Sequence, residues 1–342
     1  MSVDIVVHAR VSRRRRERTV ILVLAGIVLV LAALSLSVGA YSVSFPDLLA
    51  TLVGQGQGRD NFIVLQLRLP RLTLAVLVGL AFAVSGALFQ SLLGNPLASP
   101  DLIGITGGAS IAAVFAILVL GLSGFAVSGF AFTGALVVAT VIYALSWRSG
   151  IAGYRFVLVG IGIAFMVQAS LGYLLTRADV RDAQGALVWM VGSLSGVRWV
   201  EVVVAAVVIG VLAPVVAVLS RRLRTLQLGD DLARGLGLRV DLSRVLLLGA
   251  AVALAAAGVA AAGPIAFVAF VSAPIARRLV GTGSLALVPS ALIGIVLVVS
   301  ADFVSQHLLP GGVQVPVGII TGAIGAPYLL WLLATNRSRG EA

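Results

Sequence analysis

Side chains that perform chemistry are scarce in this sequence. It contains no cysteine and no lysine, and His8 and His307 are its only histidines. The lack of cysteine excludes disulfides, thiol catalysis and thiolate metal sites. A Walker A loop needs a lysine that reaches the phosphates of a nucleotide, so this chain cannot hydrolyse ATP with that device. Two histidines and scattered acids give no metal-ligand spacing, and we predict no metal site, no cofactor and no enzymatic activity.

One serine motif invites a catalytic hypothesis. The run Gly121-Leu122-Ser123-Gly124 is similar to the nucleophile motif of intramembrane serine proteases. Such a serine needs a base that the fold positions beside it, and the sequence offers only two histidines. A turn between two membrane spans explains the run better.

Asp302 is an acid inside a long apolar stretch. Carboxylates within a membrane are costly and often functional, so a proton relay is one hypothesis. The other, which we favour, is a buried carboxylate bonded at a helix end near the outer surface.

The composition indicates a membrane protein. Of its 342 residues 60% are hydrophobic and 11% charged, and the mean hydropathy is +1.13, whereas a soluble domain has about 25% charged residues. Several uncharged runs are near or above the length that a transmembrane helix needs. We therefore predict an all-α, polytopic membrane protein with about ten transmembrane helices in one domain, residues 20–335. The predicted spans are 20–40, 62–93, 102–120, 125–147, 156–176, 199–219, 245–262, 265–276, 285–307 and 315–334.

The arginines predict the orientation of these spans. All 24 basic residues are arginines; 18 fall in the segments placed on the cytoplasmic side and 6 in the outer segments. Because cytoplasmic segments are enriched in basic residues, both termini are expected inside. Residues 1–19 then form a cytoplasmic basic arm without fixed structure, residues 336–342 a cytoplasmic tail, and 221–244 the longest cytoplasmic loop. Since the arginines follow membrane topology, no nucleic-acid binding is predicted despite the net charge of +11.

The most specific pattern spans residues 68–110. Two arginines frame a proline, an apolar helix follows, and a run with two prolines then interrupts it. In order and spacing this resembles the signature of the FecCD family, the membrane-spanning permeases of ABC importers for ferric siderophores, haem and cobalamin. The residues that fit are Arg68, Pro70, Arg71, Gly86, Gln90, Asn95, Pro96, Leu97, Ala98, Pro100, Gly104, Gly108 and Ala109.

The resemblance implies a fold similar to the permeases of type II ABC importers, set in the lipid bilayer of the cytoplasmic membrane. It also implies ABC ATPase subunits, a substrate-binding protein and a second permease chain, identical or paralogous, as partners. Iron-siderophore is the expected cargo because it is the commonest in the family. The signature-loop residues would be Gln90, Asn95, Pro96, Pro100 and Gly104. The alternative function is an ion-gradient-driven secondary transporter that uses Asp302.

Residues 228–237 fit a short amphipathic helix. Leu228, Leu232 and Leu236 recur at i, i+4 and i+8, acids occupy the first turn, and glycines end it. The segment resembles the coupling helices of the family, which fit a cleft on the ATPase; the alternative is an ordinary solvated loop. The expected coupling residues are Leu228, Gly229, Asp230, Asp231, Ala233, Arg234, Leu236 and Gly237.

The resemblance also assigns the two mouths of the permease. Arg68 and Arg71 would receive acidic residues of the binding protein, or else anchor headgroups. Ser149, Gly153 and Tyr154 would lie near the inner gate.

Three positions depart from the family pattern. Gln306 replaces a third docking arginine, Pro274 stands where a histidine is usual, and Gln314 where a glutamate is common. A role of the usual residue cannot be assumed at these positions.

Overall fold

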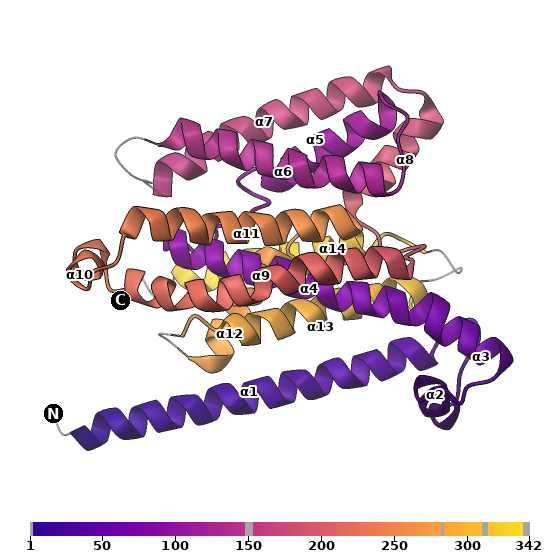
Figure 1. Ribbon diagram of the computed structural model, residues 1–342, viewed down its shortest axis with the longest axis horizontal. Helices are drawn as coiled ribbons and strands as arrows, with labels where there is room; N and C mark the ends of the chain where they lie inside the picture. The colour runs from indigo at the N-terminus through magenta and orange to yellow at the C-terminus, as the bar shows by residue number, and fades with distance from the viewer. Residues whose placement is uncertain (1–2, 148–152, 282–283, 310–313, 338–342) are drawn as a thin grey trace.

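The computed structural model describes residues 3–147, 153–281, 284–309 and 314–337. Every regular element in these ranges is a helix, and most of the long helices run side by side along one axis (Figure 1). The long or apolar helices are α1 (Val3–Ser37), α4 (Leu69–Leu93), α5 (Ile105–Leu118), α6 (Phe125–Ser146), α7 (Gly153–Arg177), α9 (Trp199–Leu226), α11 (Val240–Ala262), α12 (Val268–Val280), α13 (Leu287–His307) and α14 (Val317–Arg337).

These helices confirm the predicted all-α membrane fold. Each of the ten predicted spans corresponds to one of them. Within the described ranges, seven helices are long and apolar enough to cross a membrane. Residues 105–118 and 317–332 form shorter apolar helices, and α12 has only 13 residues. The chain is therefore a multi-pass membrane protein.

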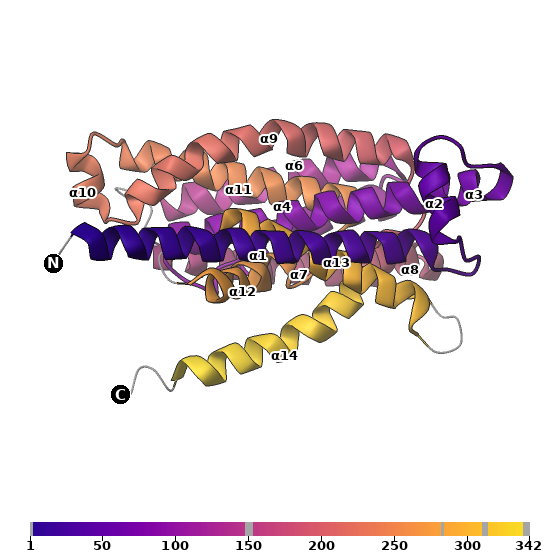
Figure 2. The same cartoon turned by 90° about the horizontal axis from the view of Figure 1, so that it is seen from below.

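Short helices join or extend the long ones. They are α2 (Phe45–Leu52), α3 (Gly58–Phe62), the π-helical turn η1 (Ile63–Arg68), α8 (Val180–Val191) and α10 (Asp230–Gly235). Among the described elements, α10 lies at one end of the molecule with the first turns of α1 and the last turns of α14, while α2 and α3 lie at the other end (Figures 1 and 2). Figure 2 also shows that α14 leans away from the bundle toward the α10 end.

Helix α4 forms the centre of the bundle. It packs against α9, α11, α12 and α13. In the apolar stretch of the segment Gly58–Leu93, which contains α4, 78% of the residues are buried, against 11% in the apolar stretch of α1. Small residues let the backbones approach closely. A Cβ atom added at Gly79 would lie 2.6 Å from the carbonyl oxygen of Gly294 on α13, so glycine is required at this crossing.

The turn η1 leads into α4 without a break. The N–H of Leu69 donates to the carbonyl of Val64, five residues back. Pro70 has no N–H, and in a regular helix its ring would clash with the carbonyl four residues earlier. The wider π turn accommodates the proline and places Arg68 at the end of η1.

One expectation about local structure was wrong, and one helix had no counterpart among the predicted elements. The basic arm is helical from Val3 as part of α1, because arginine and glutamate are good helix formers and the membrane span already provides the helix nucleus. The segment after α7 contains α8, whose polar first turn hid it from a search for apolar runs.

Candidate functional site

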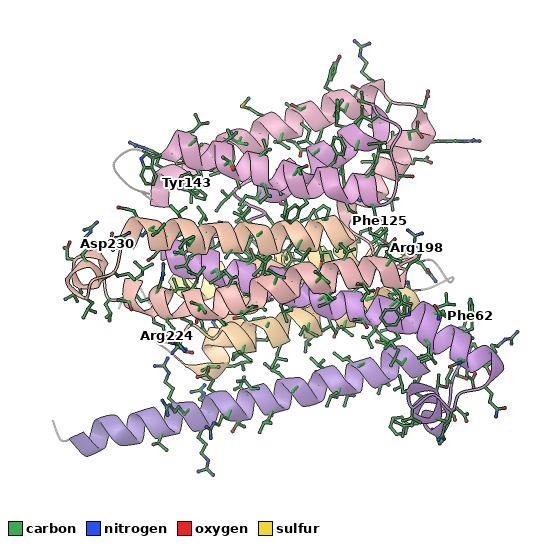
Figure 3. The ribbon with its side chains drawn as sticks, in the orientation of Figure 1. Phe62, Phe125, Tyr143, Arg198, Arg224 and Asp230 are labelled. Atoms are coloured by element: carbon green, nitrogen blue, oxygen red, sulfur yellow. The ribbon has the colours of Figure 1, made fainter. Side chains whose placement is uncertain are left out.

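The helix predicted over residues 228–237 is present as α10 but is shorter, because only Asp230–Gly235 are helical. It protrudes at the end where Asp230 is labelled in Figure 3. Oδ1 of Asp230 accepts a hydrogen bond of 2.9 Å from Nη2 of Arg244 on α11. Ala233, on the inner side of α10, is fully buried. These contacts hold α10 against α11.

Three leucines in and beside α10 are uncovered: Leu232 within the helix, Leu228 before it and Leu236 after it. Leu228, Leu232 and Leu236 are 57%, 63% and 68% exposed. Asp231 and Arg234 form only a solvent-exposed pair, 3.3 Å apart, and Gly229 and Gly237, both with positive φ, flank the helix. Exposed leucines on and beside a short helix that is bonded to α11 are suited to insertion into a complementary groove of another protein.

At the same end, the signature glutamine joins α4 to α12. Pro274 lies inside α12 and has no N–H to donate to the carbonyl of Phe270, four residues earlier. Nε2 of Gln90 donates to that carbonyl at 2.9 Å, and Gln90 is only 2% exposed. The side chain of Gln90 therefore replaces the helical hydrogen bond that Pro274 removes.

Further contacts strengthen this crossing. A Cβ atom at Gly86 would lie 1.7 Å from the carbonyl oxygen of Ala269, so α4 and α12 touch through their backbones. From α12, Nη2 of Arg277 donates to Oγ of Ser91 at 2.9 Å, and Nη1 of Arg277 to Oε1 of Gln90 at 3.4 Å. The spacing of Gly86 and Gln90 puts both on one face of α4, which explains their association in the signature.

The rest of the signature loop turns the chain from α4 into α5. Oδ1 of Asn95 accepts from the N–H of Leu97 at 2.9 Å, so this residue and Pro96 form a tight turn. The buried Pro100 accepts from the N–H of Ile105 at 3.1 Å. Gly104 has φ +86° and lies against α7, where added bulk would press on Ala164. These residues hold α4, α5 and α7 together.

Asp101 in this loop is unusual. Its Oδ2 atom is buried and has no hydrogen-bond partner among the described residues. Burial raises the pKa of this carboxyl to about 6, with a smaller opposing effect from the Thr106 hydroxyl. No sequence pattern marks Asp101 as a candidate site residue.

At the opposite end, both predicted docking arginines have internal partners. Nη1 of the half-buried Arg68 donates to the carbonyl of Leu36 at 2.6 Å, and its Nη2 donates to the carbonyl of Tyr41. Arg71 forms a forked ion pair with Asp302, with Nη2 2.7 Å from Oδ1. The two arginines therefore hold the ends of α1, α4 and α13 in place, and docking through them stays a prediction.

Asp302 is fully engaged in this cluster. Nε2 of Gln306 donates to its Oδ2 at 2.7 Å, and the Asp302 side chain is 7% exposed. This arrangement matches the favoured hypothesis of a bonded carboxylate at a helix end. It also gives Gln306 a role of its own. The amide was within reach in sequence, four residues along α13, whereas Arg71, 231 residues away, was not.

The remaining predicted positions carry less information. Ser149 lies outside the described residues, and residues 153 and 154 begin α7. Gln314 is exposed before α14. Ser123 is exposed in the turn between α5 and α6 and makes no hydrogen bond within the described part of the chain, so no geometry supports a protease.

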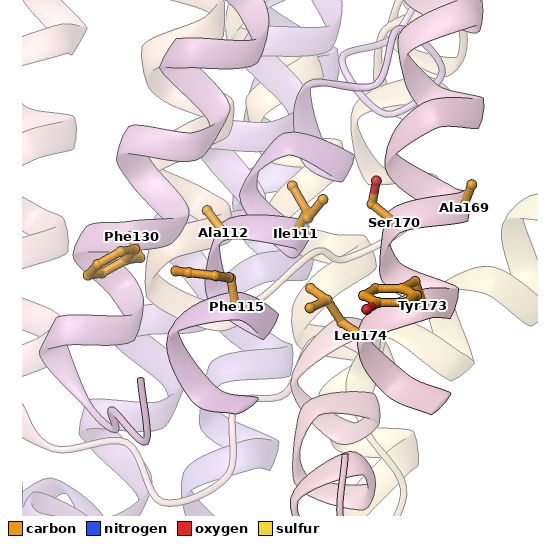
Figure 4. A pocket seen from close by; sticks show the side chains of 8 residues that line it. All are labelled: Ile111, Ala112, Phe115, Phe130, Ala169, Ser170, Tyr173 and Leu174. Carbon is orange, nitrogen blue, oxygen red and sulfur yellow. The ribbon is translucent and has the colours of Figure 1, made fainter. Parts of the chain in front are cut away.

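Two hollows lie on the membrane-facing helices. One, of about 670 Å³, lies between α5, α6 and α7, with Ser170 and Tyr173 as its only polar side chains (Figure 4). The other, of about 790 Å³, lies between α6, α8, α9 and α11, at the end marked by Phe125 and Arg198 in Figure 3. Its carboxylate, Glu201, is paired with Arg198 at 2.8 Å. Apolar walls with no uncompensated charge suit a membrane setting.

Comparison with known proteins places these features in context. The model of the FecCD transport family matches residues 27–335. The chain is 38% identical to the ferric enterobactin transport system permease protein FepG of Escherichia coli (strain K12), over 94% of this chain and 97% of that protein. It is also 38% identical to the Fe(3+)-citrate import system permease protein YfmE of Bacillus subtilis (strain 168), over 94% and 96% of the two chains.

A solved structure shows the same fold. It is a metal-chelate type ABC transporter in an inward-facing conformation, with a TM-score of 0.80 and 25% sequence identity. The similarity covers 93% of this chain and 99% of that chain.

Proposed function

Because this chain belongs to the FecCD transport family, we propose that it is the permease subunit of an ABC importer that moves an iron-siderophore inward across the cytoplasmic membrane. Two relatives of nearly equal length are permeases for ferric enterobactin and for ferric citrate. Both cargoes are ferric chelates, which supports this class of substrate. In this proposal the iron is cargo and the permease carries no metal of its own.

The exposed leucine stripe of α10 is the observation that carries the proposal. An importer needs a separate motor here, since a chain without lysine has no Walker A loop. A motor can act on the permease only through a contact surface on the cytoplasmic side. Helix α10 and its flanking residues provide one, because Leu228, Leu232 and Leu236 are uncovered while Asp230 is bonded to Arg244 of α11. Movement of a bound ATPase would thus be transmitted directly into α11.

The orientation follows from the same element. If α10 faces the ATPase, the start of α1 and the end of α14 lie on the cytoplasmic side, since all three share one end of the molecule (Figure 1). The arginine distribution predicts the same orientation. The basic arm 1–19, the loop 221–244 and the tail 336–342 are then cytoplasmic, and α2 and α3 face the binding protein.

The binding protein would dock on the rim formed by α2, α3 and the start of α4. Arg68 and Arg71 fix the shape of this rim through their internal bonds. Arg59 is exposed there, 5.5 Å from the centre of the Tyr41 ring, and provides a positive charge at the surface. We expect acidic side chains of the binding protein to meet this rim, which would orient the complex.

A second permease chain, identical or paralogous, would complete the translocation path. Only 17% of the apolar stretch of α7 is buried against the rest of the described chain. Helix α7 begins at Gly153, one of the residues predicted near the inner gate. The uncovered face of α7 is therefore our candidate for the surface that meets the second chain along the path.

The decisive experiment measures uptake of a ferric siderophore in cells whose own copy has been replaced by a variant. Leu232→Ser should abolish uptake and weaken co-purification with the ATPase, while the protein stays in the membrane at normal abundance. Leu308→Ser is the matched control, because Leu308 is 64% exposed, as Leu232 is at 63%, but lies at the other end. Normal uptake by the Leu232 variant would contradict the proposal.

A further inference from the structure

We propose that the arginines at the inner end of α1 form a binding surface for the headgroups of anionic phospholipids. The surface, here called the arginine collar, consists of Arg13, Arg14, Arg15 and Arg18. All four side chains are exposed. None of the four guanidinium groups makes an ion pair or a hydrogen bond with another residue in the described part of the chain; only the backbone carbonyl of Arg15 is bonded, to the Thr19 hydroxyl. The nearest acid in sequence, Glu17, leaves a clear excess of positive charge.

The length of α1 places the collar at headgroup depth. From Thr19 to Ser37 the helix is without charge, and at 1.5 Å per residue it rises about 28 Å, close to the hydrocarbon thickness of a bilayer of about 30 Å. Only 11% of the apolar stretch of α1 is buried against the rest of the described chain, which leaves most of the helix surface free to contact lipid. The first charged residues beyond the apolar stretch therefore meet the headgroup layer.

Neighbouring helices mark the same depth independently. Nε of Arg16 donates to the carbonyl of Leu279 at 2.7 Å, at the end of α12. The guanidinium of the adjacent Arg278 lies 4.5 Å from the centre of the Trp331 ring on α14. Tryptophan side chains concentrate at membrane interfaces, so the contacts of Arg16 fix the collar at the interface as well.

The arrangement of the collar fits lipid rather than a single protein groove. Successive residues on a helix point about 100° apart. Arg16 therefore faces α12 while the other arginines fan out around the remaining sides. Figure 3 shows nitrogen-tipped side chains that leave this part of α1 in several directions. A planar guanidinium forms paired hydrogen bonds with phosphate, and headgroups surround the helix on every free side.

The collar would link lipid to the transport helices. Arg16 binds the end of α12, and Arg277 of α12 binds α4. Headgroups that hold α1 at a fixed depth would thereby hold α12 as well. This inference needs the collar at a membrane surface but does not depend on the proposed cargo or on the ATPase.

The test uses the purified full-length chain in phosphatidylcholine nanodiscs that contain a trace of spin-labelled phospholipid. The label is either on phosphatidylglycerol or on phosphatidylcholine, and the immobilised fraction of each gives their relative affinity for the protein surface. For the native chain we expect a several-fold preference for phosphatidylglycerol that weakens in high salt. Replacing Arg13, Arg14, Arg15 and Arg18 by glutamine should remove most of that preference.

Two matched variants make the result specific. Replacing the same four arginines by lysine keeps the charge and should keep most of the preference, which shows that the arm tolerates substitution. Replacing Arg221, Arg222 and Arg224 at the inner end of α9 by glutamine removes a similar charge elsewhere and should leave the preference largely intact. An unchanged preference in the collar glutamine variant would overturn the proposal. So would the capture of inorganic phosphate or an RNA oligonucleotide by the arm without any headgroup preference.

Discussion

At the scale of single residues, two carboxylates of the membrane region are each paired with an arginine. Asp302 is held by Arg71 and Gln306, and Glu201 by Arg198. A buried ion pair is weak evidence for stability, but losing one partner leaves the other uncompensated. The outer rim therefore depends on Asp302 for its structure, whereas an ion-coupled transporter would depend on it for proton exchange.

The variant Asp302→Asn separates these two roles. It should lower the unfolding free energy in detergent by roughly 2–4 kcal/mol, since Arg71 loses its counter-charge in a mostly buried place. The double variant Arg71→Gln, Asp302→Asn should recover much of the loss. Uptake per folded molecule should persist and should not depend on the proton gradient. A stable Asp302→Asn protein with no uptake would instead support ion coupling.

Asp101 predicts a pH dependence of stability. Its pKa is raised to about 6 in the folded protein, so the folded state binds the proton more tightly than the unfolded state does. The stabilisation by this proton is present at low pH and is lost as the pH rises from about 4 to about 6. Asp101→Asn should make the midpoint temperature of thermal unfolding less dependent on pH over this range. Asp231→Asn, which removes an exposed acid on α10, is the control for the loss of a surface carboxylate.

At the scale of elements, the α4–α12 crossing explains two signature residues and one departure. Gln90 replaces the hydrogen bond that Pro274 removes, and Gly86 lets the two backbones meet. The proline at position 274, which departs from the family pattern, is therefore compensated by a neighbouring side chain. The hydrogen bond from Gln90 to the Phe270 carbonyl should contribute to stability mainly while a proline occupies position 274, whereas the contact of Gln90 with Arg277 does not depend on that proline.

A double-mutant cycle tests this dependence. Gln90→Leu leaves the Phe270 carbonyl buried without a donor and should cost about 1–3 kcal/mol of stability. Pro274→Ala restores the N–H, so Gln90→Leu should cost much less in that background. Gln184→Leu on the exposed surface of α8 is the control for the change of residue type. Equal costs in both backgrounds, measured by thermal unfolding in detergent, would rule out this role for Gln90.

The sequence predicted elements better than contacts. Each transmembrane helix is a local apolar run, and α10 has its own leucine period, so both could be recognised from neighbouring residues. Helix α8 begins with Arg181 and Asp182 and lacks such a run. The pairs Arg71–Asp302 and Gln90–Phe270 join residues 231 and 180 positions apart. Nothing local indicates such pairs, because the folded bundle alone brings them together.

At the scale of the whole molecule, the two ends differ in kind. One end carries the arginine collar, the basic end of α12 and the uncovered leucines of α10. The other carries α2, α3 and arginines that are tied down by carbonyls and Asp302. A permease that takes up cargo on one side of the membrane and contacts an ATPase on the other requires this asymmetry. The orientation of the chain in the membrane can be measured.

Because the chain has no cysteine, a single introduced cysteine is its only target for a maleimide. Ser123→Cys lies in the exposed turn between α5 and α6 at the α2 end, and Asp231→Cys lies on α10, where the side chain of Asp231 is fully exposed. With a membrane-impermeant maleimide, the first variant should label in intact cells and the second only after permeabilisation. Co-expression of the ATPase should then protect the second from label but not the first. Labelling of Asp231→Cys in intact cells would invert the orientation and remove α10 from contact with any cytoplasmic motor.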